Sequence, residues 1–480
     1  MNIVLEGLLK HATEHPDWTA AVDQEGSVTT FAGMDEASSR VAWYLREQGI
    51  GREKVVVIKM PRCAAYIAVM LGVMKVGAAY LCVEGDLKQE RLEANMRDTK
   101  ASMLFTTREW IASQEADPLP VSEWATPDEH DLAFVCSTSG STGNPKAAAQ
   151  EYGVYDTIIE SEDKALLHYM QGEDGSYTPL NKCIPGHMIF ISSIMVITSA
   201  ICHGCPIYFP QDGMAHDTAR LAEYIRDNDI HFIYLTSSGV KKLQEHKGLP
   251  LKIAHTGGEV ASGLHSEEFD IMNCYSMSEI GYILLSFYIR EPFETTPVGY
   301  PLEGAELRLV DIDRHPVDDF GILCVRVPYF RGYLGMPERT RNSFIELDGK
   351  RFFVTGDVTE IDDQGRYVIR GRYGDTIEIL GVVVEPSQVE AEAMHVAPEL
   401  GQVAARGFTA DDGTNYLALY YVADEMIPKR EFRRKFAHAT PHLKPSVFIR
   451  VDEFPLTSGG KIFRRGLPVP VAEDFLAGGI

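Results

Sequence analysis

The chain has 480 residues, which is too long for one ordinary hydrophobic core and predicts a large domain with a smaller one. It contains 45 Lys and Arg residues against 69 Asp and Glu residues, so its formal net charge is -24. This negative surplus disfavours a nucleic acid or an anionic membrane as a partner and leaves small-molecule chemistry open.

Neither the cysteine spacing nor the apolar runs indicate an oxidising or membrane setting. Eight cysteines are scattered without a disulfide-framework spacing, and Cys202 and Cys205 form a C-x-x-C pair with no further zinc ligands nearby. The longest apolar stretch, residues 188–202, is interrupted by Ser and Thr and is shorter than the roughly 20 residues that span a bilayer. Because the first residues lack a basic start and a small-residue cleavage site, we expect a cytoplasmic protein without a signal peptide.

Helix and strand patterns alternate through the first two-thirds of the chain. Apolar residues recur at helical spacing over residues 35–48 and 64–75. Short apolar runs typical of buried strands cover residues 54–59 and 79–83. Because strand and helix alternate in α/β proteins, the predicted fold class of this part is α/β.

The pattern changes to a β-rich section after about Gly321. Short alternating runs separated by Gly and Asp turns are typical of antiparallel strands, and they cover residues 323–327, 352–354, 367–369 and 376–380. The last part predicts a small α+β unit, with a helix from Ser387, a strand over 416–422 and a helix over 429–438. We therefore expect a large N-terminal domain of residues 1–372 and a small C-terminal domain of residues 373–480.

The most distinctive segment is a loop rich in glycine and hydroxyl groups, which follows a predicted strand over residues 132–135. Glycine lets backbone N–H groups turn toward an anion, the hydroxyl groups add donors, and Lys146 adds a positive charge. The segment differs from a Walker A loop because Pro145 precedes the lysine and Ala147 follows it. A polar surface loop is the plainer alternative. The predicted phosphate-binding residues are Thr138, Ser139, Gly140, Ser141, Thr142, Gly143 and Lys146.

This loop resembles the phosphate loop of the adenylate-forming superfamily, which includes acyl-CoA synthetases, luciferase-like enzymes and the adenylation domains of nonribosomal peptide synthetases. The resemblance covers nearly the whole chain. Residues 73–81 and 90–92 are similar to early motifs of the peptide-synthetase branch. The resemblance implies a large α/β domain with a β-rich section, followed by a small mobile α+β domain.

Further motifs assign nucleotide-binding roles by the same resemblance. Gly257, Gly258 and Glu259 match the turn beside the adenine. Residues 273–279 resemble the Asn-x-Tyr-Gly-x-Thr-Glu motif, which implies that Asn273 belongs to the site, that Tyr275 packs on the adenine, that Ser278 contacts phosphate and that Glu279 holds Mg²⁺. Asp357 matches the aspartate that accepts the ribose hydroxyls, and Arg372 matches an arginine that also reaches the ribose.

The C-terminal domain resembles a lid that carries a catalytic lysine. Lys461 follows a glycine-rich segment and is expected to contact the substrate carboxylate and the α-phosphate. The usual hinge aspartate falls on Gly374 with Asp375 next to it, and the usual lysine further on is Glu378, so this hinge departs from the pattern. A glycine still permits large changes of backbone angle, and Asp375 is the alternative pivot.

The implied reaction uses ATP and Mg²⁺. A carboxylate attacks the α-phosphorus of ATP and expels pyrophosphate, while Lys461, Lys146 and the metal on Glu279 neutralise charge. The acyl-adenylate then reacts with a thiol of coenzyme A or of the phosphopantetheine arm of a carrier protein. Because 19 residues follow Lys461, we expect the carrier to be a separate protein.

The sequence narrows the choice of carboxylic acid substrate without identifying it. Ile191 stands where the peptide-synthetase branch usually has an aspartate that binds an α-amine, which disfavours an ordinary α-amino acid. The candidate pocket residues are Ile191, Ser192, Met195, His255, Cys274 and Tyr282, although residues 188–201 also fit a core helix. The leading interpretation is a freestanding adenylation enzyme that loads a carrier protein. The alternatives are an acyl-CoA synthetase and a non-catalytic nucleotide-binding scaffold.

Overall fold

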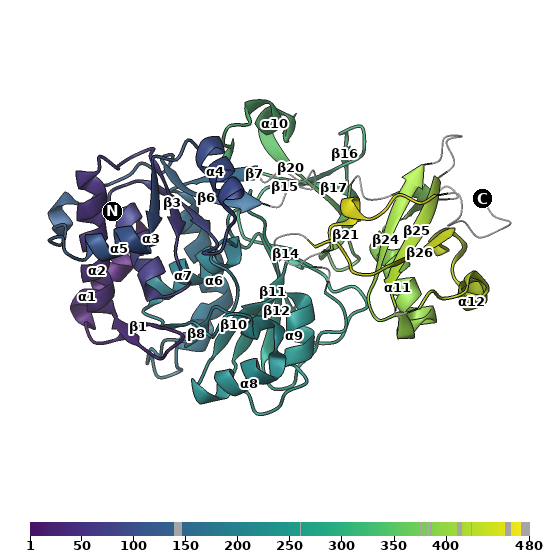
Figure 1. Cartoon of the computed structure of the whole chain (residues 1–480), viewed down its shortest axis with the longest axis horizontal. Helices are drawn as coiled ribbons and strands as arrows, with labels where there is room; N and C mark the ends of the chain where they lie inside the picture. The colour runs from purple at the N-terminus through teal and green to yellow at the C-terminus, as the bar shows by residue number, and fades with distance from the viewer. Residues whose placement is uncertain are drawn as a thin grey trace.

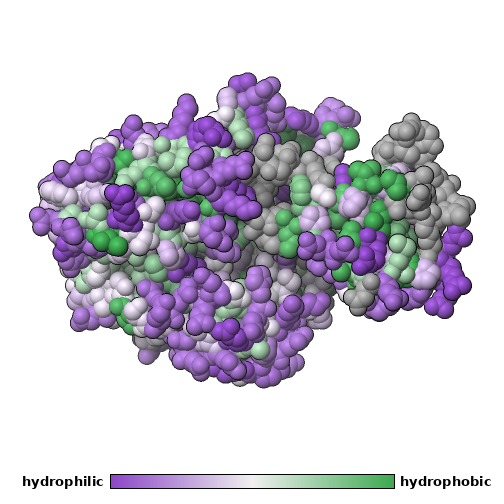
Figure 2. All heavy atoms as spheres, viewed as in Figure 1, coloured by the Kyte–Doolittle hydropathy of each residue, from purple (hydrophilic) through white to green (hydrophobic). Residues whose placement is uncertain are grey.

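The computed structural model describes residues 1–138, 146–259, 261–373, 377–379, 382–384, 386–409, 415–423, 425–456 and 462–471. Within these ranges the strands form a nine-stranded sheet, two six-stranded sheets and two small sheets (Figure 1). Hydrophilic residues cover much of the face seen in Figure 2, in line with the many charged residues of the sequence. The mixed α/β class predicted from the sequence is confirmed.

The first six-stranded sheet has the order β18-β7-β6-β4-β3-β5. Neighbours among β3 to β6 are parallel, whereas β7 pairs antiparallel with both β6 and β18. The strands are β3 (Val55–Lys59), β4 (Ala79–Val83), β5 (Met103–Thr106), β6 (Leu132–Thr138), β7 (Lys146–Glu151) and β18 (Phe330–Tyr333). The apolar runs in β3 and β4 are buried without alternation, as expected for parallel strands covered on both faces.

The nine-stranded sheet has the order β14-β13-β12-β11-β10-β8-β9-β1-β2. Its central strands β8 and β10 to β12 run parallel, so the ends of β11 and β12 lie side by side. The strands are β1 (Thr19–Val22), β2 (Val28–Thr30), β8 (Lys182–Cys183), β9 (Ile207–Tyr208), β10 (Phe232–Leu235), β11 (Ile253–Gly257), β12 (Asp270–Tyr275), β13 (Leu285–Ile289) and β14 (Tyr300–Pro301).

Helices pack against both sheets, and the largest buried cluster combines residues of both sheets with the helices α1 (Ile3–Glu14), α2 (Phe31–Glu47), α3 (Ala64–Lys75), α6 (Val154–Met170) and α7 (Ile191–His203). Helix α3 is apolar and buried on all sides, whereas α8 (Thr218–Asp227) buries one face in a second cluster with α9 (Ser237–Leu243). The remaining helices here are α4 (Gln89–Asp98) and α5 (Thr107–Ser113). Helix α2 begins earlier than predicted because the Thr30 side chain accepts a hydrogen bond from the backbone N–H of Gly33.

The β-rich section is an antiparallel sheet of order β16-β15-β17-β20-β19, with β21 also paired to β20. Its elements are β15 (Leu307–Val310), β16 (Pro316–Val317), β17 (Phe320–Val325), helix α10 (Pro337–Asn342), β19 (Phe344–Leu347), β20 (Lys350–Ile361) and β21 (Tyr367–Arg372). The antiparallel structure predicted after Gly321 is present, and it already begins at Leu307.

The last described elements have buried clusters of their own, apart from the three large sheets. They are β22 (Ile377–Ile379), β23 (Val382–Val384), α11 (Pro386–Val396), β24 (Val403–Thr409), β25 (Asn415–Val422), α12 (Lys429–Lys435) and β26 (Val447–Val451). Figure 1 shows α11, α12 and β24 to β26 together at the C-terminal end of the molecule. Among the described helices, none combines the length and the apolar character needed to cross a membrane.

Candidate active site

The strands on either side of the predicted phosphate loop are joined at its base. Thr138 ends β6 and pairs with Lys146, which begins β7. The loop residues Ser139, Gly140, Ser141, Thr142 and Gly143 lie outside the described residues. The loop therefore begins and ends at adjacent positions of the first six-stranded sheet, and Lys146 has a fixed place at its end.

Tyr333 connects the end of this loop to the predicted metal ligand. The Lys146 ammonium lies 5.5 Å from the centroid of the Tyr333 ring, and the Tyr333 hydroxyl donates a hydrogen bond of 2.6 Å to Oε1 of Glu279. Glu279 is 7% exposed. Burial, and then the charge of Glu279, raise the pKa of Tyr333 far above its usual value, so the phenol stays protonated and donates. Lys146 and Glu279, predicted from separate motifs, are thus brought to two sides of one tyrosine.

The segment that carries Ser278 and Glu279 is held by the same sheet. Gln150, fully buried on β7, donates its side-chain amide to the backbone carbonyl of Ser278 at 2.7 Å. Gly281 has φ +88°, and a Cβ there would come within 2.7 Å of Val154. This left-handed glycine lets the chain turn closely over β7 and α6, which fixes Glu279 relative to Lys146.

A second cluster joins three residues that the motifs place far apart in the chain. The Tyr275 hydroxyl donates to Oδ2 of Asp357 at 2.6 Å, and Nη1 of Arg372 lies 3.0 Å from Oδ1 of Asp357. Asp357 and Arg372 are paired across β20 and β21, and Arg372 also donates to the carbonyl of Thr355. Asp357 is 6% exposed. The predicted ribose-binding aspartate is therefore oriented by a phenol and a guanidinium.

The predicted adenine turn follows the end of β11. A Cβ at Gly257 would lie 2.3 Å from the carbonyl oxygen of Cys274, so only glycine fits the close approach of β11 to β12. Gly258 has φ +81°, and the exposed Glu259 accepts hydrogen bonds from Ser238. Asn273 is buried and donates its side-chain amide to the carbonyl of Pro297, so its polar group is engaged within the protein.

The predicted acid pocket maps onto α7, β11, β12 and the segment after Glu279. Ile191 and Ser192 are half-buried at the start of α7, and the buried members are Met195, His255, Cys274 and Tyr282. Met195, Cys274 and Tyr282 belong to one apolar cluster, and Ile191 packs against it. A core role for α7 and a role in lining a pocket are compatible with this placement.

His255 is an unusual member of this set. It is fully buried, and neither ring nitrogen has a hydrogen-bond partner among the described residues. Burial, followed by the nearby charge of Lys182, lowers its pKa to about 3, so the imidazole is neutral. Its ring meets those of Phe232 and Tyr234 edge-on, at centroid distances of 4.7 and 6.2 Å.

Sequence reasoning missed several polar groups of this region. Lys182 is fully buried and donates to the Ser199 hydroxyl at 2.7 Å, while one carboxylate oxygen of the buried Glu162 has no partner among the described residues. Tyr333 was missed because no motif marks β18. A charged residue within an apolar pattern, as at Glu162 and Lys182, was the available signal, since buried charges normally require partners.

The remaining predicted residues fall in segments that the structure does not describe. The catalytic candidate Lys461 and the hinge candidates Gly374 and Asp375 lie outside the described residues. On either side of residues 457–461, Leu456 and Ile462 form an antiparallel bridge. Arg372, immediately before the predicted hinge, is described and contacts Asp357 as given above.

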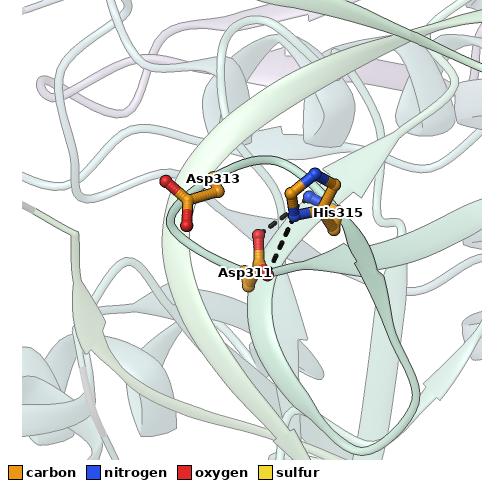
Figure 3. A group of neighbouring side chains, drawn as sticks. All are labelled: Asp311, Asp313 and His315. Carbon is orange, nitrogen blue, oxygen red and sulfur yellow. Dashed lines mark hydrogen bonds and ion pairs between the residues drawn. The ribbon is translucent and has the colours of Figure 1, made fainter.

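One group of potential metal ligands occurs among the described residues, away from the clusters above. Figure 3 shows Asp311, Asp313 and His315 in the turn between β15 and β16. The Asp311 carboxylate accepts the backbone N–H of His315 at 2.8 Å and lies 3.4 Å from its ring nitrogen. These bonds close a hairpin turn, which accounts for the grouping without an ion.

Comparisons with known proteins find a matching family and relatives that align with nearly the whole chain. The family described as AMP-binding enzyme matches residues 8–334. Tyrocidine synthase 2 of Brevibacillus parabrevis is 27% identical over 492 residues, which cover 96% of this chain and 13% of the relative. The chain thus spans a small part of that protein's length.

Solved structures share the fold. O-succinylbenzoate CoA synthetase from Bacillus subtilis, in complex with an acyl-adenylate intermediate, has a TM-score of 0.81 at 18% identity and covers 97% of this chain and 98% of its own. A four-domain nonribosomal peptide synthetase bound to AMP and glycine has a TM-score of 0.84 at 21% identity, covering 100% of this chain and 37% of its own.

Proposed function

This chain belongs to the family of AMP-binding enzymes, and it is an AMP-forming ligase that activates an acid as its adenylate. We propose that it transfers the activated acyl group to the phosphopantetheine thiol of a carrier protein. The peptide-synthetase relatives support the carrier as acceptor. The acid proposed is one without an α-amine in the usual place, since the apolar Ile191 stands at the start of α7.

The observation that carries the proposal is the meeting of Lys146, Tyr333 and Glu279. In the proposed site Lys146 neutralises charge on the phosphates of ATP, and Asp357 accepts the ribose hydroxyls with Tyr275 and Arg372 fixing its carboxylate. Lys461 contacts the acid and the α-phosphate. Residues 373–480 act as a lid that pivots at Gly374 or Asp375 and carries Lys461 into and out of the site.

The donor set fits Mg²⁺. Glu279 is a buried carboxylate whose Oε1 is fixed by Tyr333, which leaves Oε2 as a hard oxygen ligand. Magnesium usually takes one or two protein carboxylates together with substrate phosphates and water. Bound there, the ion would supply positive charge against the phosphates of ATP, and Tyr333 would keep the Glu279 carboxylate in the orientation needed to hold it.

Acid-dependent ATP–pyrophosphate exchange across a panel of amino, aryl and fatty acids tests the first half-reaction. We expect exchange with an acid lacking an α-amine, and a large loss in Lys461→Ala with ATP binding retained. ATP binding without exchange for any acid, or no effect of Lys461→Ala, would favour a nucleotide-binding scaffold.

The acceptor is tested with the acid identified in that panel. We expect loading of a phosphopantetheinylated carrier protein to be faster than formation of the acyl-coenzyme A. Faster transfer to coenzyme A would replace the proposal with an acyl-CoA synthetase. The apo carrier, which lacks the thiol arm, is the control for transfer to other nucleophiles.

A further inference from the structure

A cationic groove lies in the β-rich section, beside helix α10. It consists of two neighbouring hollows of about 320 and 570 Å³ that share Phe344, Gly349 and Arg351 in their linings. These volumes lie in or near the range of small-molecule sites. Phe330 lines the first hollow and its ring also packs on Tyr333, at a centroid distance of 5.4 Å. The groove therefore adjoins Tyr333, which supports the candidate active site.

The groove is lined mainly by cations, although the chain as a whole is acidic. The cations Arg326, Lys350, Arg351 and Arg341 line the two hollows, against the single carboxylate of Glu346, in a protein of net charge -24. Figure 2 shows hydrophilic residues over α10, where Arg341 lies. A concentration of cations on an acidic protein gives a local field that attracts anions.

Two of these arginines have no carboxylate partner within the described part of the chain. Arg326 and Lys350 share Glu306, at 2.9 and 2.5 Å, whereas the ion pairs found among the described residues include neither Arg341 nor Arg351. The guanidinium carbon of Arg351 lies 3.5 Å from the centroid of the Phe344 ring. This stacking fixes the plane of the guanidinium and leaves its N–H groups available.

The groove combines these cations with an apolar floor. Val327, Phe330 and Phe344 line it together with the guanidinium of Arg351. A guanidinium presents parallel N–H donors that match two oxygens of a phosphate, and the aromatic floor suits an apolar or aromatic remainder. We propose that the groove is a second anion site, which binds the phosphate group of a phosphate ester with an apolar or aromatic remainder.

This site goes beyond the proposed function. Arg351 and Asp357 lie on the same strand, six positions apart, which corresponds to about 20 Å along an extended chain. The groove therefore lies away from the proposed ribose site, and we expect a ligand there to bind together with ATP. The proposal and the proposed function can fail independently, because binding in the groove is measured without any acid or acceptor.

Isothermal titration at low ionic strength, with ATP and Mg²⁺ filling the nucleotide site, tests the proposal. The probes are phenyl phosphate, adenosine 3′,5′-bisphosphate and inorganic phosphate. We expect both esters to bind more tightly than inorganic phosphate, and their relative affinity shows whether a nucleotide or another ester is preferred. Absence of binding by both esters, or binding of hexaglutamate in their place, overturns the proposal.

Charge-removing variants locate the binding. Arg341→Gln and Arg351→Gln should each weaken the better ester at least about tenfold, since each removes charge-assisted hydrogen bonds. Arg351→Lys, which keeps the charge without the planar fork, should weaken it by less. Arg108→Gln removes an exposed cation of α5 and should have no effect. Equal weakening by Arg108→Gln, or unchanged affinity in the two groove variants with unchanged thermal unfolding, overturns the proposal.

Discussion

Replacing Tyr333 by phenylalanine isolates the hydroxyl that holds Glu279. The ring remains, so the contact with Lys146 at 5.5 Å is kept, whereas the 2.6 Å hydrogen bond to a carboxylate of 7% exposure is lost. A hydrogen bond to a charged group contributes about 1.5–3 kcal/mol, and a buried partner left unsatisfied loses a similar amount. We therefore expect Tyr333→Phe to lower the free energy of unfolding by about 1–3 kcal/mol in the absence of ligands.

The effect on activity should appear mainly in the dependence on Mg²⁺. Groups that orient a metal ligand typically change metal affinity or activity by about 10–100-fold when they are removed. The assay is ATP–pyrophosphate exchange as a function of Mg²⁺ concentration. We expect the apparent Mg²⁺ requirement of Tyr333→Phe to rise by about this factor, with a smaller change in the rate at saturating Mg²⁺.

Tyr329→Phe is the matched control, because it removes a tyrosine hydroxyl that donates to a glutamate on the exposed side of the same region. Its Mg²⁺ dependence should equal that of the wild type. The reasoning is refuted if Tyr333→Phe keeps the wild-type Mg²⁺ dependence, or if Tyr329→Phe shifts it equally. A third variant, Tyr333→Leu, also removes the ring, so its additional loss measures the combined contribution of the ring's contacts with Lys146, Arg339 and Phe330.

Three further outcomes are expected. Gly257→Ala should lower the free energy of unfolding by about 1–3 kcal/mol, because its Cβ would lie 2.3 Å from a backbone carbonyl. Gly186→Ala is the control, because no atom lies closer than 4.0 Å to its Cβ, and equal urea midpoints of the two variants would contradict the prediction. Asp357→Asn should weaken ATP binding in a titration by about tenfold or more through loss of charge-assisted bonds, with the exposed Asp363→Asn as control. His255 binds a proton near pH 6.5 when unfolded and near pH 3 when folded, so its stabilising contribution is present above pH 6.5 and is lost as the pH falls. Between pH 7 and about pH 5 the wild type should lose about 2 kcal/mol more than His255→Leu in urea unfolding, and parallel losses would contradict the pKa assignment.

Local patterns predicted those elements whose ends are marked in the sequence. Helix α3 and strand β4 have the predicted bounds, because each is a continuous apolar run and Gly77, with φ +71°, separates them. Helix α2 was placed too late, because its first turn is defined by a threonine cap rather than by apolar spacing. Strand pairing order could not be read locally, since β18 pairs with β7 although ten described strands, β8 to β17, lie between them in the sequence.

The site residues were likewise predictable where a local motif marks them, whereas their contacts were not. Motifs named Lys146, Tyr275, Glu279, Asp357 and Arg372. The contact of Tyr275 with Asp357 depends on how two separate sheets pack, and that of Asp357 with Arg372 on the pairing of β20 with β21. Tyr333 could not be predicted, because nothing in the local pattern of β18 distinguishes it from any other aromatic strand residue. The buried Glu162 of α6 and Lys182 of β8 likewise could not be connected from the sequence, because it is the fold that brings both of them to Ser199 of α7.

The position of Tyr333 explains why one side chain can matter for the whole site. Glu279 follows β12 of the nine-stranded sheet, and Lys146 begins β7 of the first six-stranded sheet. Tyr333 itself ends β18, and its neighbour Phe330 packs on Phe353 of β20, at a centroid distance of 5.4 Å. The tyrosine therefore lies where the three large sheets meet. Through its hydroxyl, the packing of these sheets places Glu279, the proposed metal ligand, relative to Lys146, the proposed phosphate-binding residue. Because packed interiors deform little, the distance between Lys146 and Glu279 is set by the sheets, and the hydroxyl only needs to orient the carboxylate.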